Sequence, residues 1–188
     1  MNHLYLGSSS TFSSMVKVGD FIYIFGANSI SNNINDSTFE RYSTIDINAS
    51  YHLFTFFFKG HIYTLTPATI FQFNINNKTT VELSVKITGK PMAACTDGNG
   101  NLYIQSYSEL QRINIETNEI KSFEKSTIAM NGYYNLIYHQ SNDGQSYIYS
   151  IRGKNQNYVF SFDNNKWEQI LQDDPSDRTN CANILDQK

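Results

Sequence analysis

The sequence is poor in the residues that mark extended, linker-like or disulfide-bonded chains. Only three prolines and ten glycines occur in 188 residues, which excludes a collagen-like chain or a flexible linker. The two cysteines, Cys95 and Cys181, allow a single pair and lack the short spacing of a metal site. We therefore interpret both as reduced thiols in the core of a cytoplasmic protein.

Charge and long apolar runs are also scarce. The 14 Lys and Arg residues are scattered and are outnumbered by 17 Asp and Glu, which gives a net charge of −3. A nucleic-acid-binding chain normally carries a basic stripe, so we expect no nucleic-acid partner. The longest apolar run, residues 54–58, is far too short to span a membrane, and the first 15 residues lack the features of a signal peptide. We expect no membrane partner.

The chain is rich in aromatic residues and asparagine instead. It contains 13 Phe and 13 Tyr, and 40% of its residues are hydrophobic, which is too many for a disordered chain. A chain of this length can bury one sizeable core. Asparagines gather in short polar clusters such as residues 163–166, DNNK, whose chemistry suits tight β-turns.

One local pattern recurs four times. A glycine turn precedes a short strand whose tyrosine recurs at intervals of 40, 40 and 46 residues, as Tyr23, Tyr63, Tyr103 and Tyr149. A second run of β-forming residues follows each tyrosine, and these runs end at Tyr42, Ile75, Ile115 and Phe162. Alternating apolar residues between frequent turns predict antiparallel strands. A repeat of this length with about four strands has the size of a propeller blade.

Two further strands complete each predicted blade. Innermost strands are expected before the glycine turns, at residues 14–18, 52–58, 92–96 and 133–139. Outermost strands are expected at residues 81–87, 120–123 and 167–171. We predict an all-β fold of β-propeller-type repeats, with about four antiparallel four-stranded blades. A β-sandwich has a similar number of strands, but it has no reason to repeat one pattern four times, so we favour the propeller.

The predicted domain organisation has three parts. Residues 1–12 form a lead-in, residues 13–171 hold the four repeats, and residues 172–188 form a tail. Residues 181–185 of the tail, CANIL, have the apolar content of the first strand of a further blade. The propeller would then be incomplete.

Three segments resemble degenerate kelch repeats. They are VKVGDFIYIFGA at residues 16–27, STFERYSTID at 37–46 and FSFDNNKWEQI at 160–170. Kelch blades carry a glycine pair after the second strand, an ERY-type third strand and a tryptophan in the fourth. Gly26-Ala27 is a near match to the glycine pair, and Trp167 keeps the tryptophan, which we expect to pack as a blade element. The resemblance implies a propeller built from these repeats.

The candidate binding residues lie in loops. In a propeller, the loops that join second to third strands emerge on one face, and loops on a rigid scaffold often carry function. Such loops are predicted at Asn28–Ser37, Thr66–Thr69, Ser106–Glu109 and Arg152–Asn157. Tyr and Arg are common in interface hot spots. The candidate binding residues are Asn32, Asn35, Tyr107, Glu109, Arg152 and Lys154.

No motif for catalysis or metal binding is present in the sequence. The four histidines share no short spacing, and the Asp-Gly pairs at residues 97–98 and 143–144 are typical of hairpin turns. Asp173 and Asp174 are interpreted as a solvated acidic turn. We expect no catalytic residue, no metal and no cofactor.

These observations favour a non-catalytic scaffold that binds a protein partner through the loops of one propeller face. Two alternatives stay open. An enzyme with a propeller pocket, of lactonase, lyase or oxidase type, would need acids, His or Cys at the channel ends of several innermost strands. A fragment of a larger propeller would have no independent function, and its open edges would favour self-association.

Overall fold

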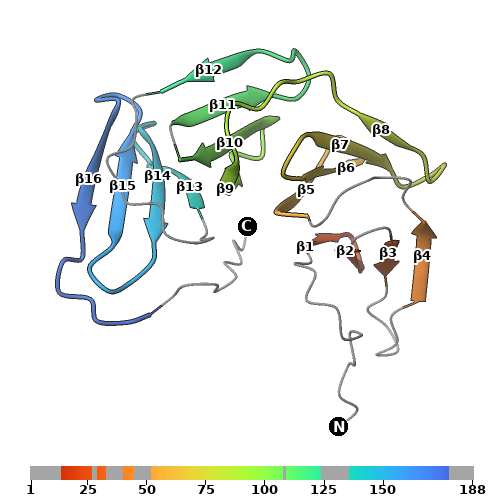
Figure 1. Ribbon diagram of the computed structural model, residues 1–188, viewed down its shortest axis with the longest axis horizontal. Helices are drawn as coiled ribbons and strands as arrows, with labels where there is room; N and C mark the ends of the chain where they lie inside the picture. The colour runs from red at the N-terminus through yellow and green to blue at the C-terminus, as the bar shows by residue number, and fades with distance from the viewer. Residues whose placement is uncertain are drawn as a thin grey trace, which may run out of the picture. The chain divides into compact units, whose positions relative to one another are not determined.

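The computed structural model describes residues 14–26, 29–32, 40–44, 52–107, 109–123 and 136–177 (Figure 1). These residues form sixteen β-strands and no helix. The strands build four antiparallel sheets of four strands each, and in every sheet the neighbours are consecutive in the chain. This confirms an all-β fold of propeller-type blades. The chain divides into two compact units, Met1–Val81 and Glu82–Lys188, which are described in turn.

The first unit begins with blade 1. Its strands are β1 (Ser14–Val18), β2 (Phe21–Gly26), β3 (Ser29–Asn32) and β4 (Glu40–Thr44). Gly19 and Asp20 form the tight turn between β1 and β2, and Gly19 supplies the left-handed backbone, with φ of 57°. The predicted innermost strand at residues 14–18 is confirmed.

Blade 1 corrects two predictions. The sequence predicts a polar loop at Asn28–Ser37 followed by a third strand ending at Tyr42, but Ser29–Asn32 already forms the third strand. Residues Glu40–Thr44 form the fourth strand, although the kelch resemblance implied a third. The polar composition of SISN hid the strand, because pairing with β2 uses backbone groups and β-propensity is a weak guide.

Blade 2 supplies the rest of the first unit. Its strands are β5 (Phe54–Phe58), β6 (His61–Leu65), β7 (Ile70–Asn74) and β8 (Thr80–Glu82), of which β8 crosses the boundary between the units. Strand β1 packs against β5. The buried core of this unit contains Tyr23 and Phe25 from β2 with Ile62 and Phe73 from blade 2. The Phe25 and Phe73 rings meet edge to face, with centroids 6.2 Å apart.

The second unit contains blades 3 and 4. Blade 3 comprises β9 (Pro91–Thr96), β10 (Asn101–Ser106), β11 (Leu110–Asn114) and β12 (Ile120–Ser122). Blade 4 comprises β13 (Leu136–Gln140), β14 (Ser146–Ile151), β15 (Asn157–Ser161) and β16 (Lys166–Ile170). The outermost strands β8 and β12 are each three residues long, shorter than the strands predicted at residues 81–87 and 120–123.

One hydrophobic core joins blades 3 and 4. Tyr103 of β10 stacks on Tyr138 of β13, with ring centroids 5.5 Å apart. Phe160 of β15 is buried beside Trp167 of β16, at 5.3 Å between centroids, so Trp167 packs as a blade element as predicted. Cys95 lies in the same core as a free thiol. Burial raises its pKa far above the usual range, and the nearby Asp97 charge adds to this effect.

The repeated tyrosines occupy equivalent places in the first three blades. Tyr23, Tyr63 and Tyr103 are each the third residue of the second strand, and their exposed fractions are 4%, 5% and 5%. Tyr149 departs from this pattern because it is the fourth residue of β14 and is only partly buried, whereas its neighbour Ile148 is fully buried. The tyrosine period therefore predicts a buried core position in three blades. In the fourth blade the buried position is one residue earlier.

Several predictions concern segments that lie outside the described residues. The lead-in at residues 1–12 and the apolar tail segment at 181–185, with Cys181, belong to these segments. None of the described segments is a helix of the length and apolarity needed to cross a membrane.

Candidate functional site

The loops that join second to third strands in blades 2 and 3 share one construction. In blade 2 the Thr66 backbone N–H donates to the Thr69 carbonyl at 2.9 Å, and the Thr66 hydroxyl donates to the same carbonyl at 2.9 Å. The Thr69 N–H in turn donates to the Thr66 hydroxyl at 3.1 Å. Ser106 and Glu109 repeat these three bonds in blade 3, at 3.0, 3.2 and 3.3 Å. A hydroxyl residue therefore locks each turn.

Tyr107 lies in the blade 3 turn and is exposed to solvent. It follows the locking residue Ser106, and 58% of its surface is exposed. Glu109, also predicted as a binding residue, closes the turn through its backbone, and its side chain is partly buried. The equivalent position in blade 2 is Pro67, which is partly buried. Of these two turns, the one in blade 3 offers a large exposed aromatic ring.

The loop Arg152–Asn157 of blade 4 is built differently. Arg152 is only 5% exposed, so this predicted binding residue lies in the interior of the loop rather than on an open surface. The next three residues, Gly153, Lys154 and Asn155, all have left-handed backbone, with φ of 76°, 48° and 61°. Left-handed backbone at two non-glycine residues is uncommon and usually marks a turn or a functional constraint.

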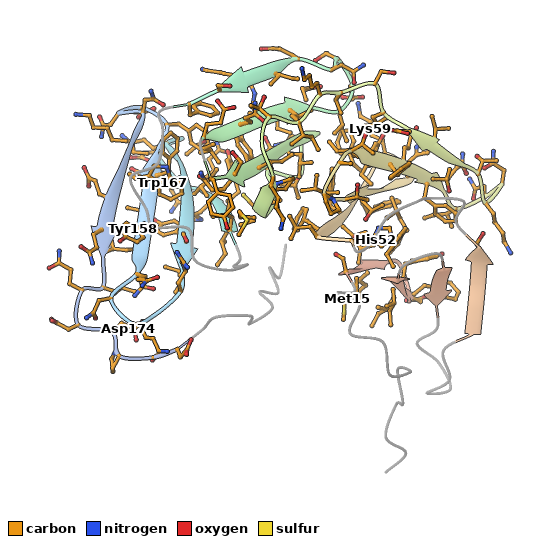
Figure 2. All side chains as sticks on the ribbon, in the orientation of Figure 1. Met15, His52, Lys59, Tyr158, Trp167 and Asp174 are labelled. Carbon is orange, nitrogen blue, oxygen red and sulfur yellow. The ribbon has the colours of Figure 1, made fainter. Side chains whose placement is uncertain are left out.

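The segment after β16 lies against this loop. We call residues Leu171–Asp177 the strap. The Lys154 backbone N–H donates to the Ser176 carbonyl at 2.7 Å, and the Asn155 N–H donates to the Asp174 carbonyl at 3.2 Å. The Lys154 ammonium pairs with the Asp177 carboxylate at 2.6 Å. Figure 2 shows Asp174 beyond the end of β16, where the strap runs below blade 4.

Asn157 joins the loop to the strap from within. This fully buried side chain accepts a hydrogen bond from the Gly153 N–H at 2.8 Å through Oδ1. Its Nδ2 donates to the Leu171 carbonyl at 3.3 Å and to the Asp174 carboxylate at 3.2 Å. Asp174 is partly buried, so the prediction of a fully solvated acidic turn is wrong at this residue.

The structure places the other predicted binding residues outside loops or outside the described part. Asn32 is the last residue of β3, where it pairs with Tyr23 and Glu40, so it does not belong to a loop. Asn35 lies outside the described residues. Sequence reasoning did not predict that the strap pairs with Lys154 or that Asn157 joins the loop to the strap. No short motif marks them, because most of the bonds involve backbone groups.

A buried polar layer lies near the same loops in the second unit. Gln105 follows Tyr103 by two residues in β10, and Ser150 follows Ile148 by two residues in β14. Because side chains alternate along a strand, both lie on faces that contribute to the shared core of blades 3 and 4. Both residues are fully buried, and Gln105 Oε1 and Ser150 Oγ have no hydrogen-bond partner among the described residues.

We expect Ser150→Ala to leave the free energy of unfolding unchanged or to raise it by up to about 1 kcal/mol. The substitution removes a buried hydroxyl for which the described part of the chain supplies no hydrogen-bond partner, and it leaves only a small gap. Urea denaturation of both proteins measures the difference. A loss of more than about 1 kcal/mol would show that the hydroxyl has a bonding partner.

Histidines and acids do not gather into a metal site within the described part of the chain. No group of three or more His, Cys, Asp or Glu side chains is found there that could hold an ion. In the first unit, His52 is buried and its Nδ1 lies 2.9 Å from the Thr64 hydroxyl, which in turn lies 3.2 Å from the Thr55 hydroxyl. This histidine is thus part of a satisfied polar cluster in the core.

Comparison with known proteins finds likeness in structure only. No family model matches the chain, and no curated protein matches it. The extracellular domain of BT4673 from B. thetaiotaomicron, described as part of a one-component system, has a TM-score of 0.63 at 14% identity. That match covers 90% of this chain and 23% of the other.

Two further solved structures also resemble this chain in fold. The extracellular domain of BT3049, from a hybrid two-component system of B. thetaiotaomicron, matches at 13% identity with a TM-score of 0.59, over 93% of this chain and 26% of the other. YjhT matches at 9% identity with a TM-score of 0.64, over 88% of this chain and 66% of its own. The chain therefore spans about a quarter of the length of the two extracellular domains. At these identities the likeness concerns the fold alone.

Proposed function

We propose that the chain is a non-catalytic module that binds another protein through the loops joining the second and third strands of its blades. The observation that supports this most directly is the turn at Ser106–Glu109, which holds an exposed tyrosine on a backbone fixed by three hydrogen bonds. This proposal includes two predictions that come from the sequence alone, namely the resemblance to kelch repeats and a cytoplasmic location.

The physical reason lies in the cost of ordering a binding surface. Each mobile side chain that an interface immobilises costs about 0.5–1.5 kcal/mol. Tyrosine offers a large amphipathic contact with only two side-chain torsions, and a turn already locked by Ser106 needs no further ordering. A tyrosine in this setting has the properties of an interface anchor.

We expect Tyr107→Ala to weaken partner binding at least about tenfold while the melting temperature stays unchanged. The exposed ring contributes little to the fold, whereas an anchor in the interface is expected to dominate the affinity. Wild type and variant are used to capture partners from the cells that produce the protein, and captured proteins are quantified by mass spectrometry. A photo-crosslinking amino acid at position 107 then identifies the contact directly.

Ile120→Ala is the matched control. Ile120 is an exposed apolar residue on the outermost strand of the same blade, where it pairs with Ile113, toward the end of β11 that is farther from the Ser106–Glu109 turn. We expect its capture profile to equal that of the wild type, and a crosslinker at position 120 to give no discrete product. Equal capture by the wild type and Tyr107→Ala would contradict the proposal.

A further inference from the structure

The strap brings negative charge to a cationic loop. Residues 173–177, DDPSD, contain three aspartates, and the loop carries Arg152 and Lys154. The ammonium of Lys154 and the carboxylate of Asp177 lie at the rim, where their side chains are 63% and 49% exposed. An ion pair exposed to this extent stabilises weakly, so it can exchange its partner at little cost.

The loop also presents its backbone to the strap. The N–H groups of the left-handed residues Lys154 and Asn155 both donate to strap carbonyls, at 2.7 and 3.2 Å. Successive N–H groups in this conformation form a concave donor surface. Bonds to main-chain carbonyls do not depend on the side chains of the bound segment, so other peptides that adopt the backbone conformation of the strap satisfy the same donors.

Two side chains add selectivity for acids at a fixed spacing. Asn157 Nδ2 donates to the Asp174 carboxylate, and the Lys154 ammonium pairs with the Asp177 carboxylate. These two aspartates are three residues apart in the strap. The two side chains therefore match the spacing of an Asp-x-x-Asp pattern, with charge-assisted bonds at both ends.

We propose that the loop Arg152–Asn157 is a binding site for acidic peptide segments of the Asp-x-x-Asp type, and that the strap occupies it in cis until a partner segment displaces it. This inference rests on the proposed function, because it names the chemistry of the partner at the loop of blade 4. The strap competes from the same chain, at an effective concentration in the millimolar range for a short tether.

The test uses a fluorescein-labelled peptide with the sequence of residues 171–178, LQDDPSDR, and the full-length chain. The variant Asp174→Asn/Asp177→Asn weakens the cis strap while leaving the loop intact. Fluorescence anisotropy should show that this variant binds the peptide at least about tenfold more tightly than the wild type, because its own strap no longer competes.

Three controls define the site. A peptide with asparagine in place of each aspartate should bind the opened variant about tenfold more weakly. Lys154→Met in the opened variant should weaken binding of the acidic peptide, whereas Lys166→Met, a lysine at the other end of β16, should leave it unchanged. Added salt should weaken binding of the acidic peptide and have little effect on that of the neutral one.

Equal binding of the acidic and neutral peptides, or no binding to the opened variant, would show that the strap is purely structural and would overturn the inference. If the double variant does not fold, the single variant Asp177→Asn is used instead. Peptide binding is then measured by hydrogen exchange at the Lys154 and Asn155 amides. Added acidic peptide should then slow exchange at these two amides, and no change overturns the inference. Partner capture through Tyr107 is measured in a separate experiment from peptide binding by the loop. A negative result in one of the two experiments therefore leaves the other interpretable.

Discussion

Replacing Phe160 with alanine is expected to destabilise the protein by about 3–5 kcal/mol. The ring is fully buried in the core of blades 3 and 4. Its centroid lies 5.1 Å from that of Phe162, 5.3 Å from that of Trp167 and 5.6 Å from that of Phe123. Three rings would lose their contact, and the strands around them cannot close a cavity of that size.

Urea denaturation measures this effect through two signals. Trp167 is the only tryptophan in the chain and touches the Phe160 ring, so its fluorescence reports on the second unit, and circular dichroism reports on all strands. Phe57→Ala is the matched control, because Phe57 is 40% exposed, and it should cost less than about 1.5 kcal/mol. Similar losses of stability for the two variants would contradict the burial of Phe160 in the core of blades 3 and 4.

The second large effect is expected for Asn157→Ala, with a loss of about 2–3 kcal/mol. This side chain makes three hydrogen bonds that tie the loop to the strap, and its removal leaves the Gly153 N–H and the Asp174 carboxylate without these partners. Urea denaturation gives the loss in stability. Hydrogen exchange should also become faster at the amides of Lys154 and Asn155, since the strap is released.

The variant Asn157→Asp separates the role of the amide oxygen Oδ1 from that of the amide nitrogen Nδ2. It keeps an oxygen that accepts from the Gly153 N–H, but it removes the donor and places a second carboxylate beside Asp174. We expect a loss at least as large as for alanine, because like charges at this distance repel. Asn157→Asp with wild-type stability would show that the bonds to the strap contribute little.

The blades were predictable because their signal is both local and repeated. Glycine turns followed by tyrosine marked the second strands, and burial of Tyr23, Tyr63 and Tyr103 follows from their equivalent place as the third residue beyond each turn. The third strand of blade 1 was not predictable from hydrophobic pattern, because Ser29–Asn32 has a single apolar residue. Its pairing depends on backbone groups that every sequence carries.

The candidate site was predicted only at the level of loops. Tyr107 stood out because tyrosine is common in interface hot spots and the residue falls in a predicted loop, and its side chain is exposed. Arg152 appeared to be a surface residue from its charge, yet it is buried. The next residue, Gly153, has left-handed backbone and forms a β-bridge with Asp177 of the strap. Nothing in DDPSD indicates that it pairs with a loop about twenty residues earlier in the chain.

The meander in each sheet has a consequence for how the chain folds. Every strand pair in the four sheets joins neighbours along the sequence, so no sheet waits for a distant part of the chain. Closing such short loops costs little entropy, and folds with low contact order form faster than other β-proteins of similar size. Each blade can therefore complete its hydrogen bonds while later blades are still being synthesised, which shortens the time that its apolar strands are exposed to aggregation.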